Sequence, residues 1–109
     1  MKEEIYNYLE TLNEETKQRF HQLYNLIYEN TSCTIEEKMW AKLSSFYNHD
    51  NLIRIIPFKD HINIEAKAAV LYKEELSAYK FTPKGMLQIS HSQPVPEKLL
   101  ITIINESLC

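Results

Sequence analysis

Glycine is almost absent, because Gly85 is the only one in the 109-residue chain. Loops that hold a phosphate on backbone N–H groups need several glycines at fixed spacing, and so does the nucleophile elbow of common serine hydrolases. The HExxH, CxxC and calcium-loop patterns are also missing from the sequence. The sequence therefore disfavours the familiar nucleotide enzymes, zinc proteases and hydrolases, and we expect a non-enzymatic protein.

Excess positive charge and long apolar runs are lacking as well. The chain has 12 Lys and Arg against 15 Asp and Glu, a formal net charge of −3. This balance lacks the basic footprint of a nucleic-acid or membrane-surface protein. The longest apolar stretch, Leu99–Ile104, is interrupted by Thr102 and is far shorter than the roughly 20 residues of a membrane span. No apolar segment typical of a signal peptide follows Met1–Glu4, so we expect a cytoplasmic protein that binds neither nucleic acid nor membrane.

Cysteine is scarce, with Cys33 and Cys109 only. Two cysteines in a cytoplasmic chain are expected to be free thiols rather than a disulfide. A catalytic cysteine needs a neighbouring His or Arg to lower its thiol pKa, and none lies close to Cys33 in sequence. We expect a structural or incidental role for each.

Helical spacing of apolar residues predicts a helix over residues 3–12 and a second helix that ends near Tyr28. Asn13 suits the N-cap of the second helix, because Glu14 and Glu15 would then lie in its first turn, where the helix dipole favours acids. The T-x-x-E pattern from Thr34 to Glu37 is typical of a capping box. It predicts a short third helix that reaches about Leu43.

The pattern changes to strands at residues 45–47, 52–58 and 62–65. The loop Asn48–Asn51 tolerates the left-handed backbone of a tight hairpin, and short loops favour an antiparallel meander. Further along the chain, we expect a helix over residues 68–79, a turn at Pro83–Gly85, a fourth strand over Met86–Ile89 and a final helix after Pro96. The β-branched run Ile101–Ile104 could instead be a strand, but the cap signals favour a helix.

These elements predict one α+β domain over residues 1–109. Its sheet is expected to be small and mostly antiparallel, with about four strands, helices at both ends and one inserted helix. Aromatic residues in the middle of the chain should pack between sheet and helices, although they could instead line a ligand pocket. They are Trp40, Phe46, Phe58, Tyr72, Tyr79 and Phe81.

Acidic residues dominate the N-terminus and form the first candidate site. If the first helix continues past Leu12, several glutamates share one of its sides. A row of exposed carboxylates can hold hard cations or ferrous iron weakly, or dock a basic partner, but it can also be the solvated face of an amphipathic helix. The best iron candidates are Glu3, Glu10, Glu14 and Glu15.

Histidines supply the second candidate site. His49 and His61 lie at opposite ends of a predicted strand, roughly 20 Å apart, so they cannot share a metal within one chain. His61 and His91 can approach each other only if the fourth strand runs antiparallel beside the third. Asp60 could orient His61 as a general base, but neighbouring strand residues point to opposite faces, so a polar turn is the simpler interpretation.

A small-ligand or protein-binding surface is the alternative to a metal site. The residues that would form it are Trp40, Lys59, His61 and His91.

Three motifs carry a family resemblance from about Thr16 to Leu108. They are Lys-x-His within Pro57–Ile64, Lys-Gly before a strand within Thr82–Ile89, and Pro94-Val95-Pro96 before the last helix. In order and spacing, the chain resembles the YdhG-like domain of unknown function. The resemblance implies a small cytoplasmic bacterial α+β domain, grouped with frataxin-like iron chaperones that hand ferrous iron to iron–sulfur or haem assembly proteins. It therefore predicts a weak intracellular iron binder.

Overall fold

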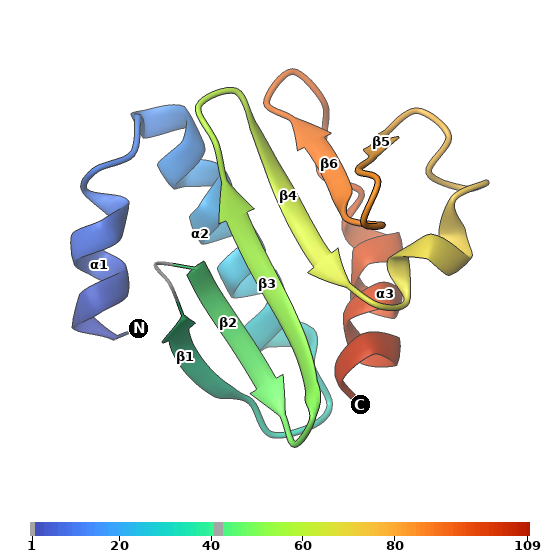
Figure 1. Ribbon diagram of the computed structural model, residues 1–109, viewed down its shortest axis with the longest axis horizontal. Helices are drawn as coiled ribbons and strands as arrows, with labels where there is room; N and C mark the ends of the chain where they lie inside the picture. Colours follow the sequence, from blue (N-terminus) through green and yellow to red (C-terminus); the bar gives the residue numbers. More distant parts are fainter. Residues whose placement is uncertain (1, 41–42) are drawn as a thin grey trace.

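The computed structural model describes residues 2–40 and 43–109, with the backbone alone at Trp40. Within these ranges the chain forms three α-helices and one sheet of six strands, in the order β1-β2-β3-β4-β6-β5 (Figure 1). The helices are α1 (Glu3–Leu9), α2 (Glu14–Asn30) and α3 (Glu97–Leu108). The strands are β1 (Glu36–Trp40), β2 (Leu43–Asn48), β3 (Asn51–Pro57), β4 (His61–Ala66), β5 (Lys80–Phe81) and β6 (Leu87–Ser90).

Every paired strand is antiparallel to its neighbour. The predicted α+β class and terminal helices are thus confirmed. The sheet has six strands in the described residues, whereas about four were predicted.

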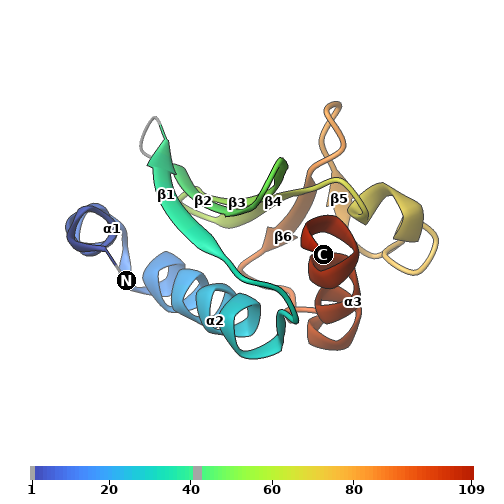
Figure 2. The same cartoon turned by 90° about the horizontal axis from the view of Figure 1, so that it is seen from below.

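The fold has two layers, with α2 and α3 against one face of the sheet (Figure 2). Strand alternation turns Ile62 and Ile64 toward the helices, where each is at most 4 % exposed. Fully burying an aliphatic side chain of this size contributes roughly 1.5–3 kcal/mol, so this face fixes the register of the sheet. The same alternation places His61, Asn63 and Glu65 on the opposite face, which no helix of the described chain covers (Figure 2).

Residues 34–43 form strands rather than the predicted third helix. β1 pairs with β2 in a register that places Glu37 opposite Phe46. Exposed Glu36 and Lys38 alternate with half-buried Glu37 and Met39, the period of a strand. Glu37 caps no helix, because its carboxylate instead accepts hydrogen bonds from the Tyr24 and Tyr28 hydroxyls of α2, at 2.6 and 2.7 Å. Tertiary contacts therefore override the local capping pattern.

Two other predicted helices are shorter than expected. The first ends at Leu9 rather than Leu12. In place of a helix over residues 68–79, there is a 3₁₀ turn, η1 (Ala69–Tyr72), followed by further turns. This segment buries Ala69 and Leu76 but exposes Glu74 and Glu75 between them. It therefore contacts the core at separated points rather than along one continuous helical face. The sequence analysis also missed the two-residue strand β5.

The turn and cap predictions are confirmed at four places. The Asn13 side chain accepts a hydrogen bond from Thr16 N at 2.8 Å, as an N-cap should. The β2–β3 hairpin forms as predicted, although its positive φ of 55° falls on His49 rather than on the Asn or Asp residues of the loop, and Gly85 has a φ of 85° in the turn before β6. α3 begins after Pro96 as expected. In the ranges that the structure describes, no helix is long and apolar enough to cross a membrane.

The two cysteines are not free thiols, because Cys33 and Cys109 form a disulfide. The expectation of free thiols was drawn from a cytoplasmic redox state and not from the fold, which brings the Cα atoms of these residues to 5.8 Å although they are 76 positions apart in sequence. The segment between α2 and β1 meets the end of α3 at this disulfide. Asn105 Oδ1 of α3 also accepts a hydrogen bond from Ser32 N there, at 3.0 Å. Disulfides persist in oxidising compartments, so this bond counts against the cytoplasmic expectation from which the free thiols were inferred.

Removing the disulfide should lower the free energy of unfolding. Closing a loop of 76 residues restricts the unfolded chain, and the chain-entropy estimate for this length is about 4.5 kcal/mol. We expect the Cys33→Ser/Cys109→Ser variant to unfold at a clearly lower denaturant concentration than the oxidised protein. Reduced wild-type protein should match the variant. Equal midpoints for the oxidised and reduced protein would contradict the prediction.

Candidate functional site

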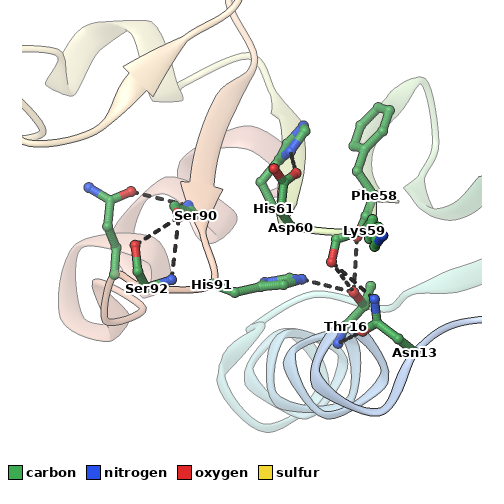
Figure 3. Close-up of polar contacts among 10 residues, drawn as sticks. Asn13, Thr16, Phe58, Lys59, Asp60, His61, Ser90, His91 and Ser92 are labelled. Atoms are coloured by element: carbon green, nitrogen blue, oxygen red, sulfur yellow. Dashed lines mark hydrogen bonds and ion pairs between the residues drawn. The ribbon is translucent and has the colours of Figure 1, made fainter.

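The tight turn between β3 and β4 is held by the start of α2. Phe58 N donates to His61 O at 2.9 Å and closes the turn. The hydroxyl of Thr16, a residue only 1 % exposed, lies 2.9 Å from Phe58 O and 3.2 Å from Lys59 O. Asn13 Nδ2 donates to Lys59 O at 3.1 Å. The residues that cap α2 therefore also fix the backbone of the turn (Figure 3).

β6 holds the same turn from its other side. His91 N donates to Asp60 O at 3.0 Å, and His91 Nε2 lies 2.8 Å from Thr16 Oγ1. The Thr16 hydroxyl hydrogen is directed to backbone carbonyls, which only accept, so we assign the hydrogen to His91 Nε2, which then donates to Thr16. Arg19 Nη2 donates to the backbone oxygens of His91 and Gln93, at 3.0 and 2.5 Å. The end of β6 and its loop are thereby anchored on α2.

His61 and His91 were expected to approach each other only if their strands were antiparallel neighbours. The structure meets this condition, because β4 pairs antiparallel with β6 and His61 lies opposite Ser90. The two histidines reach the same corner of the sheet, but their rings have different partners: His91 points to Thr16, and His61 points to Asp60 on the other side of the turn (Figure 3). The corner thus brings the two histidines near each other without joining their rings.

Asp60 and His61 form a direct pair. Asp60 Oδ1 lies 2.7 Å from His61 Nδ1, and this hydrogen bond holds the pKa of the Asp60 carboxyl below its ordinary value. The argument that neighbours point to opposite faces fails here, because Asp60 lies in the turn and only His61 in the strand. The His61 ring stacks on Phe58 with centroids 4.4 Å apart and planes 14° from parallel. Phe58 is 43 % exposed, so its predicted core position is wrong.

A hollow of about 330 Å³ lies beside this pair. Gln93 closes part of its rim, because its side chain accepts from Ser90 N at 3.1 Å and donates to Ala78 O at 2.7 Å. Ser90 and Ser92 face each other with their hydroxyl oxygens 2.9 Å apart. The lining residues are Asp60, His61, Ala78, Lys80, Gln88, Ser90, Ser92 and Gln93. The hollow therefore combines hydrogen-bond donors and acceptors with one acidic and one basic side chain.

Asn63 lies next to the hollow and has an unmatched acceptor. It stands directly opposite Gln88 in the β4–β6 pairing, on the same face as His61. The residue is only 8 % exposed, and its Oδ1 is buried with no hydrogen-bond partner among the described residues. Because an unsatisfied buried polar atom is costly, this oxygen marks a place where a donor would be favourable.

Of the predicted ligand-binding residues whose side chains the structure describes, only His61 lines the hollow. Lys59 lies in the turn and contributes its backbone oxygen, and His91 supports the turn from below. The side chain of Trp40 lies outside the described residues. Sequence reasoning missed Lys80, Gln88 and Ser90. The pairing of β4 with β6 places Gln88 and Ser90 beside His61, and its direction was left open; the pairing of β5 with β6 places Lys80 opposite Gln88, and β5 was not predicted.

The four candidate iron ligands are all exposed but do not lie along one helix. Because α1 ends at Leu9, Glu3 lies on α1, Glu10 follows it, and Glu14 and Glu15 begin α2. Glu10 is also paired with Lys17 Nζ at 2.8 Å. Among the described residues, no group of three or more His, Cys, Asp or Glu is placed to hold a metal ion. The premise of one continuous helix was wrong, and iron binding itself stays a prediction.

Comparisons with known proteins found no match: no protein-family model, no curated protein and no solved structure is significantly similar to the chain. The resemblance to the YdhG-like domain therefore stays a prediction too.

Thr16→Val should destabilise the protein. It keeps the shape of the side chain but removes the hydroxyl that connects α2, the turn and His91, leaving buried polar atoms without their partner. We expect the free energy of unfolding to fall by about 1–3 kcal/mol in chemical denaturation. Thr11→Val is the matched control, because among the described residues the exposed Thr11 hydroxyl hydrogen-bonds only to Tyr8 O, in the turn that follows α1. A loss no larger than the control's would contradict the role given to Thr16.

The Asp60–His61 pair should be visible in a carboxyl titration followed by NMR. Asp60 should titrate below its ordinary pKa of 3.8 in the wild type, and closer to that value in His61→Phe, which cannot donate the hydrogen bond. A lowered pKa in the folded state means that the pair stabilises the fold above the ordinary pKa and loses this contribution as the pH falls through the folded value. Identical midpoints in the two proteins would show that the bond is absent in solution.

Proposed function

We propose that the chain is a small-ligand-binding module whose site is the hollow beside His61. The observation that carries the proposal is the mixed polar lining: one carboxylate, one ammonium group, an imidazole, amides and two hydroxyls surround one hollow. Its volume of about 330 Å³ falls at the lower end of the roughly 300–1,000 Å³ typical of ligand sites.

Rigid support favours ligand binding over an incidental surface dent. The turn that carries Asp60 and His61 is hydrogen-bonded to both α2 and β6, and Gln93 joins the two segments that form the rim. Side chains held in advance lose less conformational freedom when a ligand binds, which raises affinity. The site is thus organised by the fold before any ligand arrives.

The proposal is tested by NMR titration of the amide spectrum with three classes of small molecule: neutral sugars, amino acids and inorganic phosphate. At least one class should shift the amides of Asp60, His61 and residues 88–93, and His61→Asn should weaken that binding at least about tenfold. His49→Asn is the matched control, because it makes the same change at the far end of β3, where asparagine tolerates the positive φ.

No shift at the hollow with any of the three classes would contradict the proposal. Saturable ferrous-iron binding, lost when Glu3, Glu10, Glu14 and Glu15 are all changed to Gln, would instead favour the iron-handling role that the resemblance implies. Calcium and zinc serve as controls in that titration, because a weak response common to every cation indicates only a solvated acidic surface.

A further inference from the structure

We infer that the hollow beside His61 takes a neutral, polyhydroxylated ligand of about monosaccharide size, with the sugar ring lying over the His61 imidazole. This inference rests on the proposed function and names the ligand class of the same site.

The first argument is a flat ring fixed at the edge of the hollow. One face of the His61 imidazole is covered by Phe58, 4.4 Å away and nearly parallel, while His61 also lines the hollow. Figure 3 shows His61 between Phe58 on one side and Ser90 on the other. The hydrogen bond between His61 Nδ1 and the Asp60 carboxylate, which accepts it, fixes the orientation of the imidazole ring. Aromatic faces carry partial negative charge, which suits the C–H face of a sugar ring.

The second argument is the balance of polar groups around that ring. Sugar hydroxyls both donate and accept, and the lining offers both functions through Gln88, Ser90 and Ser92. The charges of Asp60 and Lys80 oppose each other, so the lining has no excess of positive charge to hold an anion. A carboxylate next to the bound group would repel phosphate, whereas it can accept hydrogen bonds from hydroxyls.

The third argument is the unmatched oxygen of Asn63. It lies opposite Gln88, whose half-buried side chain lines the hollow. If a ligand displaces the Gln88 side chain from its place opposite Asn63, a ligand hydroxyl there would supply the hydrogen-bond donor that Asn63 Oδ1 lacks.

A zwitterionic amino acid is the nearest rival, because Asp60 and Lys80 carry opposite charges. The Asp60 side chain is 87 % exposed, however, so an ion pair between it and the amino group would be worth little. The backbone of an amino acid also has no flat C–H surface to cover the imidazole. The sugar therefore uses more of the site's features than the rival does.

The test titrates the protein with glucose, galactose and N-acetylglucosamine, and separately with serine and inorganic phosphate, again by amide NMR. We expect at least one sugar to bind with a Kd on the order of 1–10 mM, as suits a small neutral ligand. His61→Phe keeps a flat ring and should bind that sugar within about threefold of wild type. His61→Asn keeps polar character but removes the ring, and should weaken binding at least about tenfold.

Phe58→Leu provides a second variant, because this exposed side chain can be changed with little risk to folding. It should weaken sugar binding about threefold or more, since the imidazole loses its flat support. Tyr6→Leu is its matched control: it also replaces an exposed aromatic ring, 54 % exposed on α1, outside the lining of the hollow. It should leave the Kd unchanged.

Two results would overturn the inference while leaving the proposed function in place. One is binding of serine or phosphate at the hollow without binding of any sugar. The other is an equal loss of sugar binding in His61→Phe and His61→Asn, which would show that the imidazole acts through its nitrogens rather than its face. Failure of all the probes to shift the hollow would overturn both the inference and the proposed function.

Discussion

The corner of the molecule that carries the candidate site depends on one buried hydroxyl. Thr16 contacts two carbonyls of the β3–β4 turn and the imidazole of His91, so three segments that are distant in sequence meet at a single oxygen. A hydroxyl suits this position because it can donate to a carbonyl and accept from an imidazole N–H at the same time. With this contact in place, Asp60 and His61 project from a turn that the helix layer holds.

The elements predicted correctly are those with strong local signals. Asn13 caps α2 through its own side chain, and the β2–β3 hairpin needs only a residue that tolerates positive φ, which His49 provides. The antiparallel meander follows from short loops, which leave adjacent strands little choice of direction. These features depend on residues within a few positions of one another, and sequence reasoning can therefore reach them.

The elements predicted wrongly depend on contacts that are distant in sequence. Residues 36–40 carry helix-like spacing and a capping pattern, but pairing with β2 and the two tyrosine bonds to Glu37 favour a strand. In the site, His61 was a candidate from the sequence, whereas its surroundings were not: Ser90 and Gln88 come opposite β4 through a pairing more than 20 residues away. No sequence signal marked Asn63, which is only 8 % exposed in the folded sheet.

The backbone of the β3–β4 turn and its side chains have separate roles in the candidate site. Hydrogen bonds to α2 and β6 hold the backbone of the turn, and the charged and aromatic side chains are left on the face away from the helix layer (Figure 3). The stability of the corner and its chemistry are therefore carried by different atoms. Side chains that face the hollow can vary while the carbonyls beneath them stay in place.

The disulfide also has a mechanical consequence. Because Cys109 is bonded to Cys33, the chain from β1 to the end of α3 is a covalently closed ring that contains the whole sheet and the hollow. Tension applied between α1 and the last residue would pass along α2 and cross directly through the sulfur bridge. This covalent path bypasses the sheet, so pulling would extend the segment of α1 and α2 but could not extend the ring until the bridge was reduced.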